Sequence, residues 1–467
     1  MLGGDMELHF NLKSVFGISL FLMILQMLGM SVFAFGCGIG GLYLVWLYKN
    51  NKLSVCDGIF VLGMLVNLWY VAGLGINIRQ YDYFNFFMHA VYFVEHDFFV
   101  KNPLEYLSSA YYQPPLWGGI GGVVTKLGML LGKTREDAFD ALRYISYFAV
   151  GGAYIESFRF FKEFNFRKNV FVWGWGCFVL LPIHTILAGL NNNDALVYFL
   201  MVAILSQGYR WYVDGGVKNS LKVAGLLVLA GMVKFSGLMM LAYLGCLGIV
   251  KLCKSDKKLE FKLWSEFLVI GMGGMIGFAW GFLLLYYGLP LVPPPQDVSF
   301  QNMEAFSIMQ RLFDFSGISY LFADVRHGVI EKNVWLSLVK TSVFGEWAWN
   351  GGVASYVVYV LGIMMALFGV ISFAGVLKYK LGKDYGLNLA IVMLVFAVFI
   401  SWALFWLEFP YFCSTEFRYV VGIIVPSFLW MMNWWQQKNL PKWANKLMAS
   451  LIVIFGVCKI IVVLSTI

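Results

Sequence analysis

The sequence predicts an all-helical integral membrane protein, a single polytopic bundle of about twelve or thirteen spans that takes in residues 1–467. Hydrophobic residues make up 60% of the chain and charged residues only 13%, whereas soluble domains are typically about 45–50% apolar and 25% charged. Apolar runs of roughly 18–30 residues recur from end to end, and a helix of that length crosses a hydrocarbon core about 30 Å thick. A transmembrane barrel would instead show short segments of alternating hydrophobicity.

The placement of the charges predicts the topology. Six short polar segments hold 20 of the 34 Lys and Arg residues but only 6 of the 26 Asp and Glu residues. By the positive-inside rule these segments are expected to be cytoplasmic, so the net charge of +8 reflects membrane orientation and gives no reason to expect a nucleic-acid partner. The N-terminus lacks a signal peptide's compact basic region and cleavage site, so the first span is expected to remain. The six segments are 49–57, 159–168, 210–222, 251–262, 378–384 and 438–446.

The expected spans follow from these six cytoplasmic segments. The stretch 223–250 begins and ends at cytoplasmic loops, so it is expected to be a hairpin of two short helices with Lys234 near its apex. Residues 14–47 hold one or two further spans. The others are 58–78, 141–158, 170–188, 195–209, 264–290, 353–377, 386–407, 419–436 and 447–467.

Two long segments are expected on the outer side, 79–139 and 291–350, the second as a lid-like loop. The first contains "QPPLWGGIGGVVTKLGMLLG", which is apolar, yet the chain must stay outside until 141–158 returns it. We therefore predict a re-entrant or surface-lying hairpin over 114–132. Two consecutive prolines make a stiff entry to a helix, and the glycines permit close packing against neighbouring helices.

Polar residues of the first outer loop fall on one helical face. In "DYFNFFMHAVYFVEHD" they recur at helical spacing, opposite a face of Phe and Val. We predict an amphipathic juxtamembrane helix, with its polar side toward water or lining a cavity. The polar stripe consists of Asp82, Asn85, His89, Tyr92 and His96.

Four more polar clusters lie on the outer side, and each has an ordinary structural explanation. "QPPLW", which includes Gln113, is also typical of a simple proline turn, and "NNND", 191–194, of an Asn/Asp turn. Lys234 in "GMVKFSGL" can extend its amine to the interface. Glu416 and Arg418 in "CSTEFRYV" can anchor a span at the membrane surface.

Taken together and in order, these motifs resemble the GT-C superfamily of polytopic glycosyltransferases. The similarity is greatest to bacterial members related to protein O-mannosyltransferases and aminoarabinose transferases. It covers about 58–430, and Gln113 stands where the superfamily usually has His or Lys before the prolines. The segments that carry the resemblance are "YYQPPLW", "NNNDALVYF", "VKFSGL", "KTSVFGEW" and "CSTEFRYV".

The resemblance implies a multi-pass enzyme of the plasma (inner) membrane that acts in the cell envelope. It would transfer a sugar of the hexosyl or mannosyl type from a polyprenyl phosphate to an acceptor hydroxyl on the extracytoplasmic face, with inversion. The acceptor is a protein, a glycan or a lipid. Asp82 matches the superfamily's base, and Lys234, Arg418 and Gln113 would contact the donor phosphate.

The resemblance also assigns the remaining candidates. Asp194 would orient the acceptor, or would join Asp82 and His89 as ligands of a divalent metal, the one cofactor considered. Further residues on the acceptor side are Asn193, Glu346 and Glu416.

Two other classes of function stay open. A transporter or flippase of lipid-linked sugars would show internal repeats and interrupted helices that meet at mid-membrane, whereas here the charges gather at one face. A non-catalytic relative that binds polyprenyl phosphate is the other alternative, because Gln113 departs from the superfamily pattern.

Overall fold

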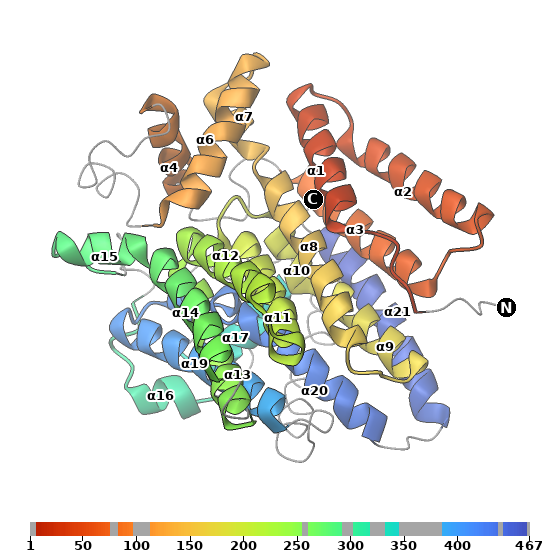
Figure 1. Cartoon of the computed structure of the whole chain (residues 1–467). Helices are drawn as coiled ribbons and strands as arrows, with labels where there is room; N and C mark the ends of the chain where they lie inside the picture. The colour runs from red at the N-terminus through yellow and green to blue at the C-terminus, as the bar shows by residue number, and fades with distance from the viewer. Residues whose placement is uncertain are drawn as a thin grey trace.

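The computed structural model describes residues 6–74, 83–96, 113–254, 260–291, 302–317, 332–344, 385–437 and 442–464. Within these ranges the secondary structure is helical, apart from one isolated bridge between Asn302 and Tyr411 (Figure 1). The predicted all-helical membrane class is confirmed. Four described helices qualify as membrane spans by length and composition, or six when each of two bent pairs is counted as one span. The predicted total of twelve or thirteen also includes 353–377, which lies outside the described residues.

The N-terminal part is a helical hairpin followed by a long span. Residues 14–47, predicted as one or two spans, form two helices, α1 (Leu12–Met27) and α2 (Val32–Lys49), and α3 (Val55–Gly73) follows. The N-terminal segment contacts the start of α3, because the His9 amide donates to Asp57 Oδ1 at 2.9 Å and Ser54 Oγ donates to the Glu7 carbonyl at 2.6 Å. The N-terminal segment therefore lies at the same end of the bundle as the predicted cytoplasmic segment 49–57.

The described part of the first outer loop forms three helices, α4 (Tyr83–Glu95), α6 (Pro115–Leu130) and α7 (Arg135–Asp140). Figure 1 shows them grouped together in the upper part of the view. The hairpin predicted inside 114–132 is wrong, because α6 is continuous and the turn comes after it. The glycines of α6 are part of the helix and let neighbouring helices pack closely against it. A Cβ on Gly128, for example, would lie 2.4 Å from Cβ of Ala138 in α7.

The central part holds the helices that form most of the core. The break between α12 and α13 falls at Lys234, which confirms the predicted hairpin over 223–250. Helix α12 approaches α14 so closely that a Cβ on Gly231 would lie 2.3 Å from the carbonyl oxygen of Gly277. The helices are α8 (Arg143–Lys162), α9 (Lys168–Val179), α10 (Pro182–Gly189), α11 (Asp194–Asp214), α12 (Val217–Val233), η1 (Phe235–Met239), α13 (Met240–Lys254), α14 (Glu260–Gly277) and α15 (Ala279–Tyr286).

The C-terminal part packs against the central helices and consists of α-helices and three short 3₁₀ turns. Its described elements are α16 (Ile308–Phe313), α17 (Val334–Phe344), α19 (Tyr385–Glu408), η5 (Phe412–Thr415), η6 (Phe417–Tyr419), η7 (Val421–Ile423), α20 (Ile424–Gln437) and α21 (Lys442–Leu464). The described part of the predicted lid-like loop is docked here, because the Met303 amide donates to the Pro410 carbonyl at 2.7 Å.

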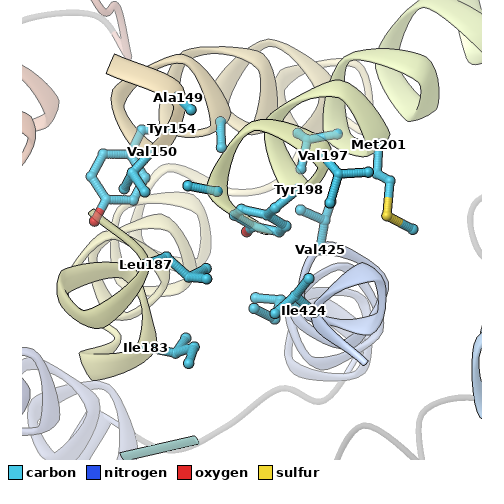
Figure 2. Packing of buried hydrophobic residues seen from close by; sticks show 14 of the residues in the cluster. Ala149, Val150, Tyr154, Ile183, Leu187, Val197, Tyr198, Met201, Ile424 and Val425 are labelled. Carbon is cyan, nitrogen blue, oxygen red and sulfur yellow. The ribbon is translucent and has the colours of Figure 1, made fainter. Parts of the chain in front are cut away.

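The core lies where α8, α10, α11 and α20 meet. Figure 2 shows Tyr198 of α11 between Leu187 of α10 and Ile424 of α20, with Val197 near Val425. The labelled side chains are buried, so the N-terminal part of α11 is held by a helix that is distant in the sequence. Helix α11 has 21 residues, which at 1.5 Å per residue gives a length of about 31 Å, close to the thickness of a hydrocarbon core.

The predicted cytoplasmic segments come together at one end of these helices. Arg210 Nη2 lies 3.5 Å from Glu163 Oε1, which joins the segments after α8 and at the end of α11. Lys251 Nζ donates to the Trp211 carbonyl at 2.7 Å. Arg167 Nη2 donates at 2.8 Å to a carbonyl in the last turn of α20.

Segment 49–57 and the start of α19, which follows segment 378–384, lie at the same end, and 378–384 itself is outside the described residues. Cys56, at the start of α3, is within electrostatic reach of Lys162 and Lys168. A Cβ on Gly386, just after the predicted segment 378–384, would lie 3.1 Å from the hydroxyl oxygen of Tyr212. The six basic segments, or the helix ends that flank them, therefore share one end of the bundle, hereafter the basic end.

Helices α9 and α10 are bent by 41° at a break before Pro182. Such a break frees backbone carbonyls, which need partners in a membrane. The Val179 carbonyl accepts from the Tyr154 hydroxyl at 2.8 Å and from Lys459 Nζ of α21 at 3.1 Å. Lys459 is fully buried, so α21 supplies a hydrogen-bond donor to the bend that carries the loop before α11.

Candidate active site

The candidate site begins at the N-terminus of α11, at the opposite end from the basic end. The loop 191–194 is buried, and Asp194 is 2% exposed. The loop closes on itself, because Asn192 Nδ2 donates to Asp194 Oδ2 at 2.9 Å and the Asp194 amide donates back to Asn192 Oδ1 at 3.0 Å. Asparagine and aspartate commonly form such local turns. The turn fixes the Asp194 carboxylate at the first helical position, where the helix dipole favours a negative charge.

Lys234 contacts this carboxylate from the break between α12 and η1. Its Nζ lies 2.5 Å from Asp194 Oδ1 and 5.1 Å from the centroid of the Tyr419 ring. The backbone of Lys234 is extended, with φ −163° and ψ 135°, so the residue leaves the helix and directs its side chain at α11. The side chain is 20% exposed, which keeps part of the amine accessible.

Arg418 brings a second cation to the same carboxylate. Its Nη1 lies 3.7 Å from Asp194 Oδ2, and its Nε lies 2.8 Å from Glu416 Oε2. Its guanidinium carbon is 5.2 Å from the centroid of the Tyr419 ring. Asp194, Lys234, Glu416 and Arg418, hereafter the ion-pair cluster, thus have two formal positive and two formal negative charges.

The proline turn docks beside this cluster. Asn193 Nδ2 donates to Gln113 Oε1 at 3.1 Å and to the Val233 carbonyl at 3.0 Å. Trp117 Nε1, one turn into α6, donates to the Asn191 carbonyl at 3.2 Å. The start of α6 is therefore held against the loop 191–194 from two sides.

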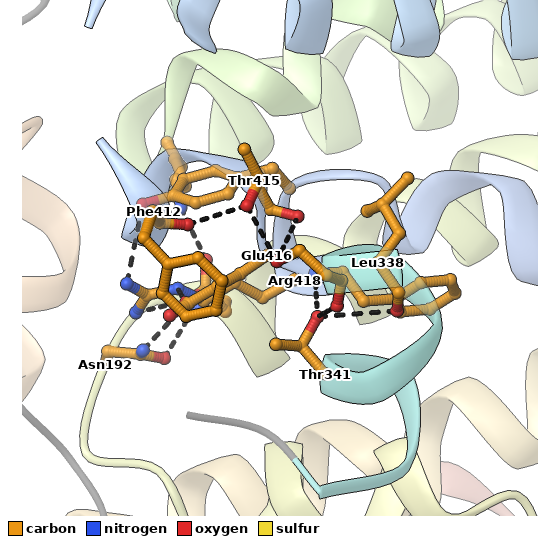
Figure 3. Close-up of polar contacts among 12 residues, drawn as sticks. Asn192, Leu338, Thr341, Phe412, Thr415, Glu416 and Arg418 are labelled. Atoms are coloured by element: carbon orange, nitrogen blue, oxygen red, sulfur yellow. Dashed lines mark hydrogen bonds and ion pairs between the residues drawn. The ribbon is translucent and has the colours of Figure 1, made fainter. Parts of the chain in front are cut away.

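The segment that contains Arg418 rests on α17. The Phe417 amide donates to Thr341 Oγ1 at 2.8 Å, and Thr415 Oγ1 donates to Ser337 Oγ at 2.7 Å. Figure 3 shows Thr341 on one side of this segment and Asn192 on the other, with Arg418 between them. The motifs "KTSVFGEW" and "CSTEFRYV" are thus in direct contact, and α17 supports the loop that presents Arg418.

Five predicted site residues meet here, and two cannot be placed. Asn193, Asp194, Lys234, Glu416 and Arg418 lie in or beside the cluster, with Gln113 bound to Asn193. Asp82 and Glu346 lie outside the described residues.

The prediction that the polar stripe on α4 faces water is wrong at His89 and Tyr92. His89 and Tyr92 are buried, at 1% and 4% exposure, whereas Phe84 of the opposite face is 62% exposed. The His89 ring packs on α6, where a Cβ on Gly118 would lie 2.4 Å from His89 Nε2. Burial lowers the pKa of His89 to about 3. His89 therefore faces α6, because Gly118 leaves room for an imidazole there.

The predicted metal site has little support among residues that can be placed. No group of three or more His, Cys, Asp or Glu residues in the described ranges is arranged to hold a metal ion. Asp194 is engaged by Lys234 and Arg418, and cations at this distance compete with a metal ion for the carboxylate. The predicted ligand Asp82 lies outside these ranges, so a metal site that includes it stays a prediction.

The structure adds a buried pair that the sequence analysis missed. Arg143, at the start of α8, pairs with Asp140 and donates through Nη1 to the Leu74 carbonyl at 2.6 Å. Asn191 hydrogen-bonds to Asp140, and burial raises the pKa of that carboxyl although Arg143 and Asn191 act in the opposite direction. The pair links the loop 191–194 to the end of α3. An arginine directly before an apolar run is the sequence signal that points to it.

The fold and this site define a class, a polytopic helical membrane protein with a buried ion-pair cluster at the end of the bundle opposite its basic loops. The chain matches no protein-family model and no curated protein. Among solved structures it is similar to ArnT from Cupriavidus metallidurans bound to undecaprenyl phosphate, with 13% sequence identity, a TM-score of 0.36, and coverage of 82% of this chain and 78% of that one.

Proposed function

We propose that the chain transfers a sugar from a polyprenyl-phosphate donor to an acceptor hydroxyl on the extracytoplasmic face of the membrane. The observation that carries this proposal is the meeting of Lys234 and Arg418 at the N-terminus of a long helix, at one end of a membrane bundle. A lipid-linked donor suits such a site, because its chain stays in the bilayer while its phosphate reaches the end of the helices.

Three features make this an anion site. The N-terminus of α11 carries the positive end of the helix dipole, which favours an anion. Lys234 acts as a compact point charge, and Arg418 offers a planar fork of N–H donors. At present the anion they hold is Asp194, and a phosphate would take over part of these contacts. This supports a role for Asp194 in holding the two cations in place, in preference to orienting the acceptor or binding a metal.

The position of the site supports an extracytoplasmic reaction. The basic end contains the segments that the positive-inside rule places in the cytoplasm, and the cluster lies at the other end of α11. The turn after α6 belongs to the cluster's side of the membrane in this proposal. Lys133 of that turn lies near the turn between α1 and α2, with its Nζ 4.0 Å from where a Cβ on Gly29 would be.

Cysteine labelling tests this topology. In a Cys413→Ser background, Lys101→Cys and Lys133→Cys are expected to react with an impermeant thiol reagent in intact cells. The control Lys218→Cys, at the start of α12, is expected to react only after permeabilisation. Labelling of Lys101→Cys without Lys133→Cys would mean that α6 crosses the membrane, which contradicts an outer active site.

In the proposed reaction the acceptor oxygen attacks the anomeric carbon of the sugar. The bond between that carbon and the phosphate oxygen breaks, and the phosphate leaves with the bonding pair. The acceptor proton passes to a base, for which Asp82 is proposed. Lys234 and Arg418 stabilise the negative charge that grows on the phosphate, so a general acid is not needed. One such displacement inverts the configuration at the anomeric carbon.

The test is release of free polyprenyl phosphate from a panel of radiolabelled polyprenyl-phosphate sugars, of hexosyl and mannosyl type among others. Asp82→Asn is expected to lower turnover by about 10²–10⁴-fold, the usual contribution of a positioned base, and to leave donor binding intact. The base also gives the rate profile an acidic limb, which Asp82→Asn is expected to abolish. The control is Asp214→Asn, an exposed carboxylate at the far end of α11.

Three results would contradict parts of this proposal. Near-normal turnover by Asp82→Asn with the correct donor would remove Asp82 as the base. Tight binding of every donor without release of polyprenyl phosphate would favour a non-catalytic lipid-binding protein. Movement of a labelled donor across the membrane without its cleavage would favour a flippase.

A further inference from the structure

The ion-pair cluster contains as many carboxylates as cations, which an ordinary phosphate site does not need. Glu416 is 1% exposed and Asp194 is 2% exposed. Buried charges are screened little by water or salt, so both carboxylates act strongly on any anion that Lys234 and Arg418 bind.

Arg418 is shared between these carboxylates. Its Nε side faces Glu416 Oε2 at 2.8 Å, and its Nη1 faces Asp194 Oδ2 at 3.7 Å. A phosphate that displaces Asp194 would take the terminal nitrogens while Glu416 keeps Nε. Two oxygens bound to one guanidinium lie only a few ångströms apart, so Glu416 would be the nearest negative charge to the bound phosphate.

The proposed transfer changes the charge of the lipid in this site. The donor is a phosphodiester with one negative charge. When the sugar–oxygen bond breaks, the oxygen keeps the electron pair and the lipid becomes a monoester with a second ionisable oxygen, whose pKa is about 6. At neutral pH and above, the product is therefore more negative than the donor. A site with two cations and no carboxylates would hold the product more tightly than the donor.

We infer that Glu416 and Asp194 are specificity-determining residues that make the site retain a singly charged lipid phosphodiester and reject the doubly charged lipid monoester that the reaction leaves behind. The inference rests on the proposed function. It gives both carboxylates a reason to be buried beside cations that bind phosphate, because their negative charges offset the two positive charges. Release of the product then does not require Lys234 or Arg418 to move away.

Two matched lipids test the inference by equilibrium binding to the purified full-length chain at pH 8. The probes are a polyprenyl phosphate and its methyl phosphodiester, which have the same chain and differ by about one charge. The wild-type protein is expected to bind the methyl diester more tightly. Glu416→Gln is expected to shift the affinity ratio toward the monoester on the order of tenfold or more, from the Coulomb energy of one charge a few ångströms away at an effective dielectric constant of about 20.

Glu408→Gln is the control, because Glu408 is an exposed carboxylate at the end of α19 and its charge is screened by water. It is expected to leave the affinity ratio unchanged. Polyprenyl phosphate should also inhibit turnover by Glu416→Gln at lower concentration than it inhibits the wild type. Should Glu416→Gln not fold, Asp194→Asn takes its place with the same expected shift in the ratio.

Lipid binding by the wild-type protein is sufficient to overturn the inference. Equal affinity for the monoester and the methyl diester at pH 8, or tighter binding of the monoester, contradicts it while leaving the proposed function intact. An unchanged ratio in a folded Glu416→Gln protein does the same. Failure to bind either lipid would instead contradict the proposed function, and the inference with it.

Discussion

Two lysines at opposite ends of α11 have almost the same surroundings. Lys234 and Lys251 both have side chains that are 20% exposed, and each pairs with a carboxylate that is 3% exposed, Asp194 and Glu266 respectively. Each amine also lies over an aromatic ring, at 5.1 Å and 4.9 Å from its centroid. Composition and burial alone therefore do not distinguish a binding site from a structural support.

The partners of the two carboxylates do distinguish them. Glu266 accepts from Trp211 Nε1 at 2.9 Å and from the Gly216 amide at 2.7 Å, with Lys251 at 3.5 Å. Asp194 is bound by Lys234 at 2.5 Å, with Arg418 at 3.7 Å. Glu266 thus has two neutral N–H donors and one cation, whereas Asp194 has one neutral donor, Asn192 Nδ2 at 2.9 Å, and two cations, which in our proposal exchange it for another anion.

The largest expected effect separates the two lysines directly. Lys234→Ala is expected to weaken donor binding more than tenfold, since a charge-assisted hydrogen bond contributes about 1.5–3 kcal/mol. Arg418→Ala is expected to do the same. Lys251→Ala removes an equally buried amine at the basic end and is expected to change the donor Kd by less than about twofold, because neutral donors there remain in place. Equal losses in Lys234→Ala and Lys251→Ala would show that the effect is general destabilisation.

Removal of Glu266, the carboxylate at the basic end, is expected to lower stability and to leave donor binding unchanged. Glu266→Ala leaves the Trp211 and Gly216 donors without their acceptor, and each buried unsatisfied donor costs about 1–3 kcal/mol. We expect a lower thermal unfolding temperature in detergent with an unchanged donor Kd for the folded fraction. A drop in donor affinity at constant stability would mean that the basic end takes part in binding.

A glycine pair on α6 tests how the site end is packed. Gly118→Ala would place a Cβ 2.4 Å from the His89 ring, and overpacking of this kind costs about 1–3 kcal/mol. Gly119→Ala meets no atom within 4 Å and is expected to stabilise α6 by up to about 1 kcal/mol. Thermal unfolding of the two variants measures the difference, and equal stabilities would contradict the contact between α4 and α6.

The smallest effect is expected at Gln113. Gln113→His loses one bond from Asn193, which keeps its bond to the Val233 carbonyl at 3.0 Å, and a hydrogen bond contributes about 0.5–1.5 kcal/mol. The fold is expected to persist. When the new histidine is protonated, near pH 6, its charge is expected to tighten donor binding by up to about tenfold relative to pH 8. Unchanged donor preference and rate at both pH values would mean that this position has no part in recognition.

The sequence predicted which segments meet but not how their polar groups are paired. Motif order and the positive-inside rule placed Asp194, Lys234 and Arg418 on one side, and the helix break at Lys234 was predicted from the charges that flank it. Lys234 and Arg418 were predicted to contact phosphate directly. Their pairing with Asp194 could not be predicted, because the local sequence does not show how close a side chain lies to a carboxylate on another helix.

The errors at His89 and α6 have a common cause. Helical periodicity shows which residues share a face, but it does not show whether that face meets water or another helix. The glycines of α6 were expected to permit close packing, and α4 and α7 do approach α6 there, but the sequence did not show which helices would do so. Asp140 and Arg143 were missed for the same reason, since their partners at Leu74 and Asn191 are distant in the chain.

The hydrogen bond between Lys459 and the Val179 carbonyl has a consequence for how the protein is made. Its two partners are 280 residues apart, and at about 5–20 residues per second of synthesis roughly 15–60 s pass between them. Until α21 enters the membrane, the Val179 carbonyl in the bend between α9 and α10 lacks the hydrogen bond from Lys459, and the loop before α11 lacks that support. A nascent chain can thus carry every residue of the cluster and still be immature.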